Sequence, residues 1–207
     1  MDYHALALSC GWVAVGTTFG GTSVQFARAR RRGVEGVSLA TWTLFVLMGL
    51  FWIAYGVTRG SATIVLGSLL VLPLQVALVV RLRPWRAWPV VARAVGFAVG
   101  FCVLPTLVWG WPGGVYGTGI AMVLNRTPQI VALVRHGDAA GVSVAMWSLG
   151  VAGAVLWVIY YQSAHLWAAM IATSLAGVAS LSIALLARWR HHQAHPLVRA
   201  GNDLVHA

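Results

Sequence analysis

Seven mostly apolar stretches, each close to the roughly 20 residues that a helix needs to cross a bilayer, follow one another along the chain. Only 9% of the residues are charged, against about 25% in soluble domains, so most of the folded surface is expected to face lipid. The predicted spans are residues 5–27, 38–57, 61–80, 89–109, 113–134, 142–161 and 165–187. This pattern predicts an all-α membrane protein with seven transmembrane helices.

The arginines predict how these spans are oriented, because basic loops stay on the cytoplasmic side. One set of loops and span ends carries Arg28, Arg30, Arg31, Arg32, Arg81, Arg83, Arg86, Arg135, Arg188 and Arg190, and the opposite set carries only Arg59. We therefore expect the N-terminus outside and the C-terminus in the cytoplasm. The all-Arg basic composition indicates a GC-rich bacterium, so the expected location is the inner (plasma) membrane.

The net charge of +10 does not point to nucleic acid. The basic residues form short clusters between apolar runs, as loops beside anionic lipid do. The partner that these clusters predict is therefore the lipid bilayer, and a homo-oligomer is left open.

The chain contains an internal repeat. The stretch GVSLATW at residues 36–42 returns as GVSVAMW at residues 141–147, and WIAY at 52–55 returns as WVIY at 157–160. These pairs lie 105 positions apart, and each copy holds three predicted spans. Two three-span copies joined directly would point in opposite directions, so the unpaired fourth span makes the copies parallel, a recognised transporter plan.

The repeat divides the chain into four parts. Residues 1–83 form the first three-helix repeat, 84–110 the linker helix and 111–190 the second three-helix repeat. Residues 191–207 form a polar cytoplasmic tail, whose histidines are read as incidental rather than as metal ligands. The expected architecture is thus two parallel three-helix bundles plus a linker helix, or 3+1+3.

The second copy carries Pro128-Gln129, then a basic turn at 135–137, then Gly-Val-Ser at 141–143 and Trp147. This series resembles the PQ-loop motif, and the first copy matches it with Gln25 but with valine in place of the proline. In 3+1+3 form the chain resembles the SWEET sugar transporters and their half-size bacterial relatives, the SemiSWEETs. The resemblance implies facilitated, bidirectional uniport of mono- or disaccharides by alternating access. It also implies that the third helix of each unit packs between the other two.

The resemblance further implies a substrate site at mid-membrane, between the two units. The aromatic pairs of the family fall on Trp52/Tyr55 and Trp157/Tyr160, and the position of its asparagine falls on Ser68 and Thr173. Flat rings suit the apolar faces of a sugar and hydroxyls suit its polar groups, which makes these residues the candidate substrate site. The alternative is that the Trp and Tyr residues anchor helices at the membrane interface.

Asn125 and Arg126 lie deep in the fifth span, where a charge is costly and often functional. Asn125 is expected to contact the substrate. Arg126 is expected to contact the substrate or to latch an inner gate to Gln25 or Gln129, and the alternative for Arg126 is snorkelling toward the cytoplasm. Pro128 also lies in the fifth span. A proline has no N–H group for the helical hydrogen bond and kinks the helix that contains it, which makes Pro128 a candidate hinge.

The sequence points away from an enzyme, a cofactor or a metal site, because no nucleophile–base pair, phosphate loop or metal-ligand spacing is evident. The favoured function is a carrier for a small neutral solute, most of all a sugar. Two alternatives stay open: a PQ-loop carrier for an amino acid or a vitamin-like solute, and a non-transporting receptor or scaffold on the same fold.

Overall fold

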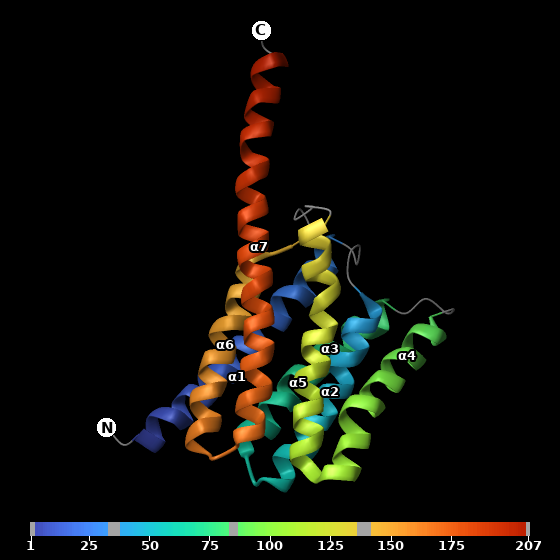
Figure 1. Cartoon of the computed structure of the whole chain (residues 1–207), viewed down its shortest axis with the longest axis vertical. Helices are drawn as coiled ribbons and strands as arrows, with labels where there is room; N and C mark the ends of the chain where they lie inside the picture. Colours follow the sequence, from blue (N-terminus) through green and yellow to red (C-terminus); the bar gives the residue numbers. More distant parts are fainter. Residues whose placement is uncertain (1–2, 33–37, 83–86, 136–141, 206–207) are drawn as a thin grey trace.

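The computed structural model describes residues 3–32, 38–82, 87–135 and 142–205, and these are helical apart from short turns (Figure 1). The elements are α1 (Tyr3–Arg32), α2 (Leu39–Thr58), α3 (Ala62–Leu82), α4 (Trp88–Ala98), the π-helical turn η1 (Val99–Val103), α5 (Leu104–Arg135), α6 (Val144–Ser163) and α7 (Trp167–Val205).

Five helical segments are long and apolar enough to cross a membrane, which confirms the prediction of an all-α membrane protein. They are Leu39–Thr58, Ala62–Leu82, Trp88–Arg135, Val144–Ser163 and Trp167–Gln193. Helix α1 is not among them, although its 30 residues are long enough, because its glycines and threonines make it less apolar.

The 48-residue segment Trp88–Arg135 is not straight, because the backbone of Gly110 is non-helical, with φ 70° and ψ −169°. A left-handed φ of this kind favours glycine. The chain reverses there, so that α4 and η1 form one arm and most of α5 forms the other (Figure 1).

Glycines let these two arms pack backbone to backbone close to the turn. A Cβ atom on Gly113 would lie 2.6 Å from the carbonyl oxygen of Pro105, and one on Gly117 would collide with the carbonyl of Phe101. The absence of side chains at these positions therefore permits close contact between the two arms. The π-helical turn η1 lies just before Pro105, whose missing N–H leaves the carbonyl of Phe101 without its usual helical donor.

The tight turns of the chain gather at one end of the molecule, which we name the tight-turn end. Figure 1 shows the α2–α3, α4–α5 and α6–α7 turns at this end. By the bounds of the helices, Gly60, Gly110 and His165, the three described residues with positive φ, lie in these turns. At the opposite, arginine-rich end, α5 finishes at Arg135, and Arg190 of α7 donates hydrogen bonds to the carbonyls of Leu133 and Val134.

The helices form a ring in which α3 packs against both α1 and α2, and α7 packs against both α5 and α6. On one side the ring is closed by extensive packing of α1 on α6. On the other side α2 touches α5 at few positions, and α4 lies against α2.

The repeated serine of the GVS stretch has a local structural role in both copies. Ser38 begins α2 and Ser143 begins α6, each in an extended conformation. Their side-chain oxygens accept hydrogen bonds from the backbone N–H of Thr41 at 3.4 Å and of Met146 at 3.3 Å. Both copies therefore start their second helix with the same N-cap, which satisfies a donor that a helix end otherwise leaves free.

Helix α7 continues to Val205, well beyond residue 190, where the sequence predicts the start of a polar tail. Between Trp167 and Gln193 only Gly177 interrupts a run of residues that suit a helix, so nothing in the chain stops α7 at the membrane boundary. The predicted loop residues Arg83, Arg86 and Gly141 lie outside the described residues.

Candidate functional site: a central cavity

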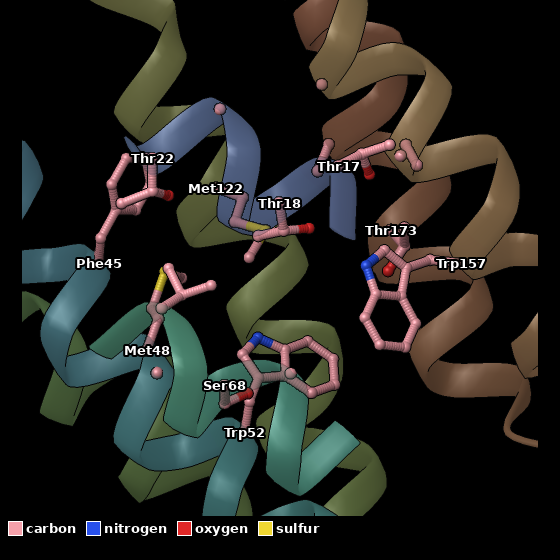
Figure 2. A pocket seen from close by; sticks show the side chains of 18 of the residues that line it. Thr17, Thr18, Thr22, Phe45, Met48, Trp52, Ser68, Met122, Trp157 and Thr173 are labelled. Atoms are coloured by element: carbon pink, nitrogen blue, oxygen red, sulfur yellow. The ribbon is translucent and has the colours of Figure 1, made fainter. Parts of the chain in front are cut away.

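A cavity of about 310 Å³ lies in the middle of the helical ring, a volume at the lower end of the range for small-molecule sites. Its described walls come from α1, α2, α3, α5, α6 and α7. Figure 2 shows Trp52 and Ser68 on one side of this space and Trp157 and Thr173 on another. Four of the residues expected to bind substrate therefore line one cavity. The first repeat contributes Trp52 and Ser68, and the second repeat contributes their equivalents Trp157 and Thr173.

A stack of three aromatic rings forms the wall of the cavity toward the tight-turn end. The ring of Tyr161 is nearly parallel to that of Trp52, with centroids 6.3 Å apart and planes inclined by 11°. The same ring stacks on Trp157 at 5.3 Å and 18°. Trp52 and Trp157 both border the cavity, but the phenol of Tyr161 lies between them.

Sequence reasoning missed Tyr161, which lines the cavity in place of its neighbour Tyr160. The available signal was its spacing, because Tyr161 lies four residues after Trp157 and shares its helix face. The ring of Trp157 also reaches the first repeat: a Cβ atom on Gly67 of α3 would lie 3.7 Å from it.

Tyr55 and Tyr160 lie in a second layer, behind the cavity wall and nearer the tight-turn end. Tyr55 is 2% exposed, and the guanidinium of Arg59 lies 5.4 Å from its ring centre. The hydroxyl of Tyr160 lies 2.7 Å from that of Ser61. These two tyrosines therefore seal the end of the cavity and do not border its space.

Helix α1 adds three threonines to the wall that the sequence analysis did not select: Thr17, Thr18 and Thr22 (Figure 2). The hydroxyls of Thr17 and Thr18 donate to the carbonyl of Ala14 at 2.8 Å and 2.9 Å, so their oxygens keep lone pairs for a ligand. Their signal in the sequence is a polar cluster inside an otherwise apolar span.

Arg126 of α5 borders the cavity and makes its hydrogen bonds inside the second repeat. Its Nε donates to the hydroxyl of Ser180 at 3.1 Å, and one terminal nitrogen donates to the carbonyl of Met122 at 2.9 Å. The guanidinium also lies 5.8 Å from the ring centre of Trp147. These contacts hold the charge against the cavity wall.

In the conformation described, the hydrogen bonds of Arg126 go to Ser180 and Met122 and not to Gln25 or Gln129, so the latch stays a prediction. Side chains on a helix lean toward its N-terminus, and Arg126 accordingly bonds Met122, one turn back, while Gln129 lies on the other side. Neither glutamine is among the residues that line the cavity.

Asn125 also lies off the cavity, and its side-chain oxygen accepts a hydrogen bond from Thr41 of α2 at 3.3 Å. It thereby joins α5 to α2, where the two repeats otherwise meet at few positions. The side chain of Pro128 lies outside the described part of the structure. Within α5, the residue with a non-helical backbone is Gly110.

Among the residues described, no three His, Cys, Asp or Glu side chains are grouped so as to hold a metal ion. The chemistry that the cavity offers is instead stacking, hydrogen bonding and one positive charge. Comparison of the chain with protein-family models, with curated proteins and with solved structures found no match.

Proposed function

We propose that this protein is a membrane carrier that lets a small hydroxylated solute, of the size of a mono- or disaccharide, diffuse across the bilayer by alternating access. The observation that carries the proposal is the cavity itself, enclosed by six helices and bordered by Trp52, Trp157, Ser68 and Thr173. A scaffold does not need such a space at the centre of its helices, whereas a carrier does.

We further propose that the chain has the 3+1+3 plan of the SWEET and PQ-loop carriers. In this plan α1 to α3 and α5 to α7 are the two repeats, and the arm before Gly110 is the linker. Three features support it: the central position of α3 and α7, the equivalent caps at Ser38 and Ser143, and the cavity-lining pairs 105 positions apart.

In this mechanism the apolar face of a sugar stacks on the indoles while Ser68 and Thr173 exchange hydrogen bonds with its hydroxyls. The aromatic stack and the Ser61–Tyr160 contact bar the tight-turn end in the conformation described. Exchange to the other side requires that contact to break. It also requires the helices to close at the arginine-rich end.

Uptake of radiolabelled sugars and amino acids into proteoliposomes tests the proposal. The double variant Trp52→Ala, Trp157→Ala is expected to lose sugar flux by about tenfold or more, because each lost stacking contact contributes on the order of 1 kcal/mol and 1.4 kcal/mol is tenfold. Trp109→Ala is the matched control, since that indole is 71% exposed and borders no described part of the cavity. A folded double variant with wild-type flux, or a wild type that moves no solute, would overturn the proposal.

A further inference from the structure

Arg126 is the one lining residue with a permanent charge among those that the structure describes around the cavity. The chain has four carboxylate side chains, on Asp2, Glu35, Asp138 and Asp203. The first three lie outside the described ranges, and Asp203 follows Ser180 by 23 positions along α7. Among the described residues that line the cavity, none therefore supplies the guanidinium with a counter-ion.

The guanidinium does not escape to the nearest membrane surface. Because α5 runs toward the arginine-rich end, the lean of its side chains carries Arg126 back toward the middle of the bundle. The hydrogen bonds to Met122 and Ser180 keep it there. Snorkelling to the arginine-rich end, the alternative weighed from the sequence, would place the guanidinium on the opposite side of its own Cα.

A guanidinium has five N–H donors in a planar fork. The structure pairs two of its nitrogens, Nε with Ser180 and one terminal nitrogen with Met122. The other terminal nitrogen has no hydrogen-bond partner among the described residues. Free donors beside a cavity match the oxygens of a carboxylate, which arginine binds in a bidentate manner.

The first repeat presents a different group at the same level. Thr22 matches Arg126 at the offset of 104 that also relates Gln25 to Gln129, and Gln75 matches Ser180 at the offset of 105. Both Thr22 and Gln75 line the cavity. The side-chain oxygen of Gln75 is buried and has no hydrogen-bond partner among the described atoms. A buried acceptor without a donor favours a ligand hydroxyl at this point. The cavity is thus asymmetric, with a cation on one wall and a free acceptor on the other.

We propose that the solute of this cavity is a hydroxylated monocarboxylate, a sugar acid, whose carboxylate pairs with Arg126 and whose hydroxylated body lies against Trp157, Trp52 and Thr173. This inference rests on the proposed function and narrows its substrate class. Arg126 supplies a single positive charge, which balances one carboxylate and leaves a dianionic phosphate half neutralised. Thr173 and Ser180 are seven residues apart on α7, about 10 Å of helix rise, which suits an extended six-carbon acid.

Equilibrium binding of radiolabelled D-gluconate and D-glucose to the purified protein in nanodiscs tests the inference. Wild type is expected to bind gluconate more tightly than glucose, and Arg126→Gln is expected to lower the ratio of the two affinities by tenfold or more. Arg126→Lys, which keeps the charge but not the fork, is expected to fall between them. Arg93→Gln is the matched control, because Arg93 is exposed on α4 and its Nε donates to the carbonyl of Pro89.

Wild type that binds glucose and not gluconate would overturn the inference, as would an unchanged affinity ratio in Arg126→Gln. If Arg126→Gln does not fold, as judged by size-exclusion chromatography, the ratio in Arg126→Lys decides, and a wild-type ratio overturns the inference. Gluconate binding without flux in liposomes would keep this site and overturn the carrier function. Glucose flux without gluconate binding would support the carrier function and overturn the inference that the solute is a sugar acid.

Discussion

The phenolic oxygen of Tyr160 lies 2.7 Å from the hydroxyl oxygen of Ser61, and this contact joins α6 to α3 at the tight-turn end. The two residues belong to different repeats, so the contact crosses the boundary at which a two-unit carrier has to open. Gly11 of α1 makes room for it, because a Cβ atom there would lie 2.8 Å from the ring of Tyr160. The Ser61–Tyr160 contact is thus a polar link beside the aromatic stack that covers the cavity.

Replacement of Tyr160 by Phe is expected to remove this link while the ring stays in place. The lost hydrogen bond should lower the free energy of unfolding by about 1 kcal/mol. It should also speed the labelling of a cysteine placed at Met48, in the cavity, by a reagent added at the tight-turn end. Thermal unfolding and labelling rates, in a background without Cys10 and Cys102, measure both effects.

Tyr161→Phe is the matched control, because no hydrogen bond of the Tyr161 hydroxyl is recorded and its ring stacking is kept. Equal labelling in the two variants would show that the Ser61 contact does not close the cavity.

Thr41 and Asn125 join α2 to α5 on the side of the ring where the repeats touch least. A double-mutant cycle with Thr41→Val and Asn125→Ala is expected to give a coupling energy of about 0.5–1.5 kcal/mol, the usual size of one hydrogen bond. Unfolding of the four proteins in detergent measures it. Thr127→Val should change stability little, because its hydroxyl is exposed and bonds its own helix at Val123. A coupling energy near zero would mean that this bond does not hold the two helices together.

The apolar pattern predicted most of the helices, because lipid imposes a length on every span. The predicted spans 38–57 and 61–80 became Leu39–Thr58 and Ala62–Leu82. The repeat also predicted that Trp52 and Trp157 would face each other across a central cavity, since equivalent residues of parallel units lie at equal depth. Both border the cavity, but the ring of Tyr161 lies between them. The seven-span plan and the binding role of these residues remain predictions.

The choice between Tyr160 and Tyr161 could not be made from the sequence. Adjacent residues of a helix point about 100° apart, and only the packing of α1 against α6 turns Tyr161 to the cavity and Tyr160 to Ser61. The length of α7 was equally hidden, since the polar residues after Arg188 suit both a helix and a tail. The direction of the Arg126 side chain follows from the direction of α5, because side chains on a helix lean toward its N-terminus.

The contact between Gly119 and Ala172 predicts a packing limit between α5 and α7. A Cβ atom on Gly119 would lie 2.7 Å from the Cα of Ala172, which is backbone and cannot move aside cheaply. Gly119→Ala is therefore expected to lower the free energy of unfolding by about 1–3 kcal/mol. Gly16→Ala in α1 should not, because nothing lies within 4 Å of its added Cβ. Melting temperatures of the two variants measure the contrast, and equal melting temperatures would contradict the close approach of α5 and α7.

The arginine distribution predicts that the tight-turn end faces outward and the arginine-rich end faces the cytoplasm. Single cysteines at positions 2 and 203, in a chain without Cys10 and Cys102, report the two sides. In intact cells an impermeant reagent should label position 2 alone. Labelling of position 203 from outside would reverse the orientation.

The driving force for flux follows from the charges at the cavity. The described residues that line it include no carboxylate to carry a proton, so an imposed pH gradient is not expected to concentrate any solute in liposomes. A membrane potential should leave glucose flux unchanged, because the neutral sugar carries no charge across. Gluconate carries one negative charge. Moving that charge through a membrane potential of 100 mV changes its free energy by about 2.3 kcal/mol, which corresponds to a gluconate concentration ratio across the membrane of roughly fifty at equilibrium. Uptake measured under potassium diffusion potentials of both signs tests this, with glucose as the internal control. Proton-driven accumulation of either solute, or an equal response of both to the potential, would contradict simple uniport of an anion past Arg126.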